Sequence, residues 1–172
     1  MQHDLPLTRP YREFLTNMRT YYKVPQVMSD ADALPVLRRR LGVLPESLVL
    51  AQAAIESGWG SSRFARQANN LFGQWCYQAG CGLVPARRRA GATHEVRSFE
   101  TIEAAIDAYY RNLNTNPVYK PVRDIRENAD TSPSGLELAA GLELYSELGD
   151  AYIEKVRKLI RSNDLEAVTG EG

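Results

Sequence analysis

The feature that most constrains the fold is a break in helical periodicity. On both sides of residues 69–99, apolar residues recur at helical spacing, whereas within that stretch they do not. The stretch instead contains several glycines, Pro85 and the segment THEVRSF, which are typical of irregular turns and a small hairpin. The sequence therefore predicts an α+β chain that is mostly helical and carries one small irregular or hairpin lobe.

The helical segments around this lobe have recognisable starts and stops. Pro45 and Glu46 suit a helix start, and Gly58 suits its end, so the clearest helix is predicted over 45–57. Other helices are predicted from about Thr8, over 30–41, over 101–114, after Gly135 and from Asp150. A chain of 172 residues suits one core. We expect a helical extension over 1–42 packed on a domain over 43–162, and a polar tail over 163–172.

Charge and hydropathy exclude two classes of partner. Lysine plus arginine and aspartate plus glutamate both number 21, so no net field attracts nucleic acid or an anionic membrane surface. No apolar run approaches the roughly 18 residues of a membrane span. The first residues, MQHDLPLTRPYREF, do not have the pattern of a signal peptide, which predicts a cytoplasmic protein or a mature or trimmed form.

The cysteines are Cys76 and Cys81, and the histidines are His3 and His94. A structural zinc site needs about four ligands, and His3 is too distant in the sequence to complete one. We therefore predict no metal. Gly80 and Gly82 allow the short loop to close a disulfide, which persists only in an oxidising compartment, while the spacing alone equally fits two free thiols.

The candidate catalytic residue is Glu56, in the last turn of the predicted 45–57 helix. The negative end of the helix dipole and apolar neighbours, among them Trp59, both favour the protonated carboxyl and raise its pKa. A general acid working near neutral pH needs such a raised pKa. The alternative is a solvated glutamate at a helix end. The last turn of a helix more often carries lysine or arginine than an acidic residue. Glu56 departs from this local rule, and residues that depart from local rules tend to mark functional sites.

The segment LVLAQAAIESGWGSSRFARQANNLFGQW resembles the catalytic segment of the Bax-type proteins within glycoside hydrolase family 73. The resemblance continues through WCYQAGCGLVP, GATHEVRSFETIEAAIDAYYRNLNTNPVY and GLELYSELGDAYIEKVRKLI, covering about residues 43–162. It implies a lysozyme-like domain that cuts β-1,4 bonds on the N-acetylglucosamine side of peptidoglycan. The family's acid is the glutamate of the pattern A-x-x-E-S-x-W-G, which is Glu56 here.

The second catalytic group is less well defined by the sequence. The resemblance places a second carboxylate in the hairpin lobe, where Glu95 is the best match. Its structural alternative is a strand residue paired with Arg97 or with one of the arginines at 87–89. A different route uses the substrate's own acetamido group as the nucleophile. Tyr145, which resembles a family tyrosine, would then orient that group, although the interval from Tyr145 to Tyr152 is one residue longer than in the family and the family's proline is missing.

Candidate sugar contacts are Asn70, Gln74, Trp75 and Tyr110, because a glycan groove combines flat apolar faces with a few polar groups. Aromatic residues at these spacings are more often part of a core, and adjacent asparagines such as Asn69 and Asn70 commonly bond to backbone in turns.

Taken together, the sequence predicts an endo-β-N-acetylglucosaminidase that acts on peptidoglycan glycan strands in the periplasm or cell envelope, with no cofactor. In that compartment the disulfide is the favoured state of Cys76 and Cys81. Two alternatives stay open: a lytic transglycosylase, and a wall-binding module without catalysis. The sequence does not determine the oligomeric state.

Overall fold

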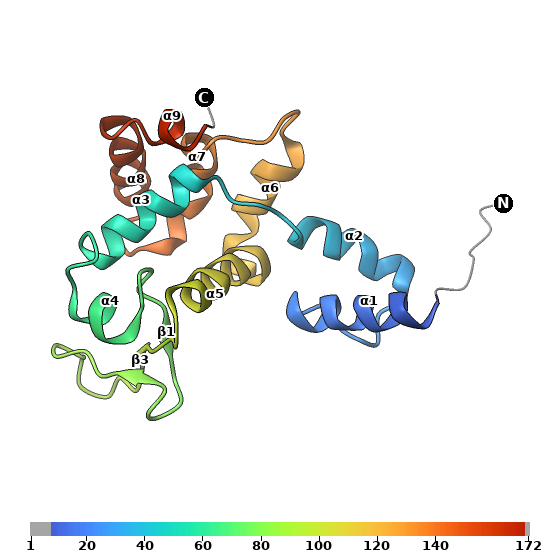
Figure 1. Ribbon diagram of the computed structural model, residues 1–172, viewed down its shortest axis with the longest axis horizontal. Coiled ribbons are helices and arrows are strands. Elements are labelled where there is room, and N and C mark those ends of the chain that lie inside the picture. The colour runs from blue at the N-terminus through green and yellow to red at the C-terminus, as the bar shows by residue number, and fades with distance from the viewer. Residues whose placement is uncertain (1–7, 171–172) are drawn as a thin grey trace.

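The computed structural model describes residues 8–170, and Figure 1 shows a main body from which an N-terminal helical hairpin projects. The hairpin consists of α1 (Arg9–Tyr21) and α2 (Asp30–Arg40). The Ser29 hydroxyl accepts a hydrogen bond from the Asp32 amide and so caps α2. Val24, Ala33 and Leu37 form an apolar cluster that belongs to this hairpin and is separate from the main core.

The main body is helical and is built around α3 (Glu46–Ser57), whose start and end agree with the prediction to within one residue. Helices α7 (Gly135–Leu138), α8 (Asp150–Ser162) and α9 (Leu165–Thr169) pack against α3. The other helical elements of the body are α5 (Ile102–Thr115), η1 (Pro117–Tyr119), α6 (Lys120–Asn128) and η2 (Ala139–Tyr145). Their apolar faces meet in one core, whose fully buried members include Leu48, Ala51, Leu113, Leu142, Val156 and Ile160.

The lobe between α3 and α5 contains α4 (Arg63–Ala68) and a small antiparallel sheet of β1 (Trp75–Cys76), β2 (Gly82–Leu83) and β3 (Glu95–Arg97). The strand order is β1-β3-β2, and Cys76 is paired with Glu95 in the register. Cys76 and Cys81 are joined in a disulfide, which resolves the choice that the sequence left open. The predicted fold class, α+β and mostly helical with a hairpin lobe, is confirmed.

The end of the chain differs from the predicted polar tail. Residues 165–169 form α9, in which Leu165 packs against the main core. The left-handed backbone of Asp164 turns the chain after α8 and directs α9 back onto α3. Residues 1–7, which include His3, and residues 171–172 lie outside the described part of the chain.

Polar contacts join the hairpin to the body. Arg39 forms ion pairs with Asp124 and Glu127 of α6, and the Tyr21 hydroxyl donates a hydrogen bond to Asp107 of α5.

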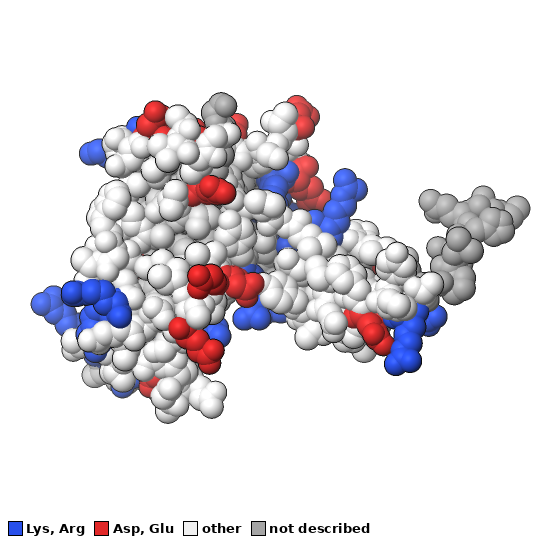
Figure 2. Space-filling model, in the orientation of Figure 1, with Lys and Arg blue, Asp and Glu red and all other residues white. Residues whose placement is uncertain are grey.

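On the face seen in Figure 2, acidic and basic side chains are interspersed over body and hairpin. Within residues 8–170, no helix combines the length and the apolar character needed to cross a membrane.

Candidate active site

The C-terminal end of α3 forms a tight turn that sets the position of Glu56. Gly58 adopts the left-handed conformation that favours glycine, and its amide bonds to the Ala54 carbonyl. Trp59 also has a positive φ of 56°, and the Ser57 hydroxyl accepts from the Gly60 amide at 2.7 Å. Trp59, which was expected to supply part of the apolar wall around Glu56, is 70% exposed.

Glu56 is half-buried, and burial raises the pKa of its carboxyl group, as the sequence predicts. Two weaker influences oppose this effect: a hydrogen bond from Tyr152 and the charge of Lys155, both on α8. The Tyr152 hydroxyl donates to Glu56 Oε1 at 2.7 Å. On the other side, Gly73 lies so close that a Cβ atom there would be 3.3 Å from Glu56 Oε2. The carboxyl group is therefore enclosed by α8 and by the loop after α4.

Two tyrosines from the C-terminal part of the chain lie at this site, with their rings stacked 5.5 Å apart. Tyr145, the predicted catalytic tyrosine, donates its hydroxyl to the Phe72 carbonyl at 2.9 Å. Tyr152 is the tyrosine that contacts the Glu56 carboxyl group. Tyr145 therefore supports the loop that covers Glu56, and Tyr152 acts on the carboxyl group directly.

Glu95 lies in the hairpin lobe, where its carboxylate accepts hydrogen bonds from the amides of Gly80 at 3.0 Å and Gly82 at 2.8 Å. These two donors, together with the nearby charge of Arg88, hold the pKa of Glu95 below its usual value. The carboxylate thus organises the loop that the Cys76–Cys81 disulfide closes. It also stays ionised under conditions in which Glu56 holds its proton.

Two predicted sugar contacts have their amide groups engaged within the protein. The Asn70 side chain is buried, donates to the carbonyls of Gln74 and Arg97, and accepts from the amides of Phe72 and Gln74. The Gln74 side chain donates to the Ala105 carbonyl at 2.9 Å. Asn70 therefore fixes the shape of the loop over Glu56, and Gln74 ties that loop to α5. Their contact with a sugar stays a prediction.

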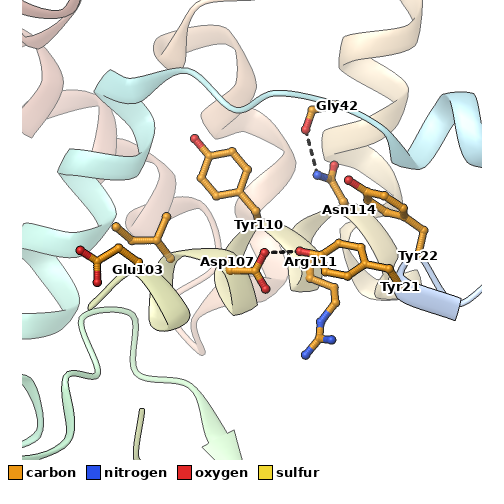
Figure 3. Close-up of a pocket in the computed structure, with 9 residues that line it drawn as sticks. Tyr21, Tyr22, Gly42, Glu103, Asp107, Tyr110, Arg111 and Asn114 are labelled. Carbon is orange, nitrogen blue, oxygen red and sulfur yellow. Dashed lines mark hydrogen bonds between the residues drawn. The ribbon is translucent and has the colours of Figure 1, made fainter. Parts of the chain in front are cut away.

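The two predicted aromatic contacts lie in different surroundings. Trp75 is 56% exposed and stacks on His94 with ring centroids 4.1 Å apart, so it presents an aromatic surface at the hairpin lobe. Tyr110 lines a separate pocket of about 370 Å³ between α5 and the N-terminal hairpin, together with Tyr21, Asp107 and Asn114 (Figure 3). The lining of that pocket does not include Glu56.

The sequence did not single out three residues that complete the site: Gln52, Tyr109 and Gly73. Gln52 is fully buried on the apolar face of α3, one turn before Glu56. A polar residue four positions before a catalytic candidate on the buried face of a helix is a signal for such a role. Gly73 and Tyr109 have no comparable signal, because only the tertiary structure brings them to α3.

The described residues include one group of three potential metal-ligating side chains, Cys76, Cys81 and Glu95. Because the two sulfur atoms are bonded to each other, they do not offer the thiolates that a soft metal needs.

Comparison with known proteins agrees with this geometry. Residues 31–165 match the family model Glucosaminidase, described as mannosyl-glycoprotein endo-β-N-acetylglucosaminidase. The chain belongs to the glucosaminidase family. Membership places this glucosaminidase among the glycoside hydrolases, which confirms the resemblance seen in the sequence.

Two relatives extend the comparison. Protein bax of Escherichia coli K12 is 35% identical over 119 residues, which are 67% of this chain and 42% of that protein, so the chain spans less than half of that relative's length. A truncated glycoside hydrolase domain of FlgJ from Salmonella typhimurium has a TM-score of 0.52 at 20% identity, covering 89% of this chain and 97% of that domain. This structural likeness supports the lysozyme-like fold.

Proposed function

We propose that this glucosaminidase is an endo-β-N-acetylglucosaminidase that cleaves β-1,4 bonds of peptidoglycan glycan strands, with Glu56 as the general acid. The observation that carries the proposal is the Glu56 carboxyl group, which is half-buried, has a raised pKa and is held in place by Tyr152. Such a group holds its proton to a higher pH than an ordinary glutamate and is placed to transfer it to the oxygen of the departing sugar. Family membership supports glycan as the substrate.

The test of this proposal is the replacement Glu56→Gln, which keeps the shape of the side chain and removes the proton that is transferred. We expect release of soluble fragments from purified peptidoglycan to fall at least about a hundredfold, since general acid catalysis contributes about 10²–10⁴ in rate. Glu46→Gln, at the exposed start of the same helix, is the matched control and should leave the rate unchanged. Undiminished cleavage by the Glu56→Gln variant would contradict the proposal.

Analysis of the released fragments decides between the proposed reaction and its alternatives. Reducing N-acetylglucosamine ends identify hydrolysis on the predicted side of the disaccharide, and anhydromuramyl ends identify a lytic transglycosylase. Sedimentation with insoluble wall without any fragment release identifies a binding module. Mass spectrometry of the digest distinguishes the three outcomes.

We propose Glu95 as the second carboxylate, acting as a base or a nucleophile. Its support is electrostatic: burial raises the pKa of Glu56, whereas the Gly80 and Gly82 amides lower that of Glu95. Opposite shifts of this kind distinguish the acid from the base in glycosidases. If Glu95 has this role, Glu95→Ala should lose cleavage and added azide should restore it, with a glycosyl azide as product. If the acetamido group is the nucleophile, the variant should retain cleavage.

We place the working protein in the cell envelope. A peptidoglycan substrate lies outside the cytoplasmic membrane, and the Cys76–Cys81 disulfide fits an oxidising compartment.

A further inference from the structure

A chain of hydrogen bonds runs from the core of the body to Glu56. The Tyr109 hydroxyl of α5 donates to Gln52 Oε1 at 2.6 Å, and Gln52 Nε2 donates to the Tyr152 hydroxyl at 2.9 Å. The Tyr152 hydroxyl in turn donates to Glu56 Oε1 at 2.7 Å. The three inner members are almost fully buried, with exposed fractions of 0%, 0% and 2% for Tyr109, Gln52 and Tyr152. Water therefore does not compete for these bonds.

The distances define the direction of the chain. Hydrogen bonds between two oxygens are typically about 2.7 Å, and those from nitrogen to oxygen about 2.9 Å. The 2.6 Å contact with Tyr109 therefore fits the amide oxygen of Gln52, and the 2.9 Å contact with Tyr152 fits the amide nitrogen. With the amide in this orientation, the Tyr152 oxygen already accepts a hydrogen bond from Gln52, so the hydroxyl hydrogen of Tyr152 is available to donate to Glu56.

Ring stacking prevents the ends of the chain from moving. The Tyr109 ring stacks on Phe72 at 4.1 Å, and the Tyr152 ring stacks on Tyr145 at 5.5 Å. Tyr145 is itself bonded to the Phe72 carbonyl. Through Phe72 in the loop after α4, these contacts connect α5 to η2 and α8, and the hydrogen bonds of Gln52 connect α5 and α8 to α3. This arrangement keeps the Tyr152 hydroxyl beside the Glu56 carboxyl group.

We propose that Gln52 is a positioning residue whose amide, held by Tyr109, directs the Tyr152 proton onto Glu56. This inference rests on the proposed function and deepens it. When Glu56 gives its proton to the leaving oxygen, negative charge develops on the carboxylate, and a hydroxyl already pointing at it stabilises that charge without rearrangement. Gln52 touches neither the substrate nor the transferred proton.

The charged and titratable groups that face Glu56 come from four elements. Tyr152 and Lys155 belong to α8, Tyr109 to α5, Tyr119 to η1 and Tyr145 to η2. The hydrogen bond that Tyr152 donates favours the ionised form of Glu56 and so lowers its pKa. Loss of this hydrogen bond therefore raises the pKa of Glu56. In a pH profile of kcat/KM, the basic limb reports this pKa and should then move to higher pH.

The decisive variant is Gln52→Glu, which keeps the side-chain volume and replaces the nitrogen donor by a second acceptor. The Tyr152 proton should turn toward the new carboxylate and away from Glu56. We expect the basic limb of kcat/KM, measured with solubilised peptidoglycan, to move up by about one pH unit and kcat to fall about tenfold. Gln52→Leu leaves the Tyr152 proton with Glu56 as its partner, so its basic limb should move much less.

Two further variants support the interpretation. Tyr109→Phe frees the Gln52 amide to turn and should move the limb in the same direction by a smaller amount. Tyr109→Phe also takes the place of Gln52→Glu as the test if that variant does not fold. Tyr21→Phe removes a tyrosine hydroxyl that bonds to Asp107, away from Glu56 and from the chain of hydrogen bonds, and should leave the profile unchanged. If the basic limb of the kcat/KM profile stays at the same pH in both Gln52→Glu and Tyr109→Phe, the inference is overturned. Gln52 would then be only a structural residue.

A measurement without substrate separates this inference from the proposed function. Carbon-13 NMR of the Glu56 carboxyl group, assigned by comparison with Glu56→Gln, follows its titration in the folded protein. A raised pKa in both Gln52→Glu and Tyr109→Phe supports the positioning role even if Glu56 proves not to be the acid, because Tyr109→Phe adds no charge that could repel the Glu56 carboxylate. An unchanged pKa overturns the role even if Glu56→Gln abolishes cleavage.

Discussion

At the scale of single residues, the two glutamates proposed as catalytic groups have surroundings that shift their pKa values in opposite directions. Glu56 loses water to the apolar body and has one hydroxyl donor, so its neutral form is favoured. Glu95 is also largely shielded from solvent, but two backbone amides point at its carboxylate and favour the charge. Hydrogen-bond donors therefore decide the ionisation of Glu95, and desolvation decides that of Glu56.

The raised pKa of Glu56 has a consequence for stability. A carboxyl group with a raised pKa in the folded state stabilises the fold only where it is protonated, and this contribution is lost as pH rises through the folded pKa. Glu56→Gln removes the titration, so we expect the variant to melt at a higher temperature than the parent at pH 7. Below about pH 4, the unfolded value for glutamate, the difference should disappear. Calorimetry at both pH values checks this, and a variant that is less stable at pH 7 would contradict it.

At the scale of elements, the hairpin lobe is too small to be held by its sheet alone. Its strands are two or three residues long, and β1 and β2 each pair only with β3. The disulfide closes the loop between β1 and β2, and Glu95 of β3 binds two amides of the same loop. Because the pKa of Glu95 is lowered, its contribution is present above the unfolded pKa and is lost as pH falls through the folded value.

Removal of the disulfide should therefore destabilise the protein measurably. In the chain-entropy model, a loop of this length contributes about 2 kcal/mol to the free energy of unfolding. We expect the double variant Cys76→Ser, Cys81→Ser to lose about this amount in urea denaturation. The parent protein treated with a reductant is the matched control and should behave like the variant. Equal denaturation midpoints for the oxidised parent and the variant would show that the disulfide does not constrain the unfolded chain.

At the scale of the whole molecule, the N-terminal hairpin and the body are joined mainly by polar contacts. Each has its own apolar cluster, and the linker between them includes Val43, which is 80% exposed. Partly exposed ion pairs such as Arg39–Glu127 contribute about 0–1 kcal/mol each. The hairpin is therefore less firmly held than the helices around Glu56, as its projection from the body in Figure 1 suggests.

Hydrogen exchange on the intact chain tests this difference. We expect amides in α1 and α2 to exchange through local opening, with lower protection than amides in α3 and α8, whose exchange needs global unfolding. Arg39→Ala should lower protection in α2 further and leave α8 unchanged. Equal protection in all four helices would mean that hairpin and body unfold as one cooperative unit.

The sequence by itself determined the longest helices, the position of the lobe and the choice of Glu56 as the proposed acid. Local signals were sufficient for these, because Pro45, Gly58 and the period of Leu48, Ala51 and Ile55 act within a few residues along the chain. The raised pKa of Glu56 also followed from its place in an apolar helix. The C-terminal α9 was missed because its polar composition conceals Leu165, whose burial depends on the turn at Asp164.

Only the tertiary structure decided which side chains surround Glu56. Gln52 is one helical turn away in the sequence, but Tyr109 and Tyr152 come from α5 and α8, and Gly73 comes from the loop after α4. Helical spacing places each tyrosine on a buried face without showing which residue its hydroxyl meets. That choice depends on how three helices pack at one point, and hydrogen bonds form only where this packing brings a donor within about 3 Å of an acceptor.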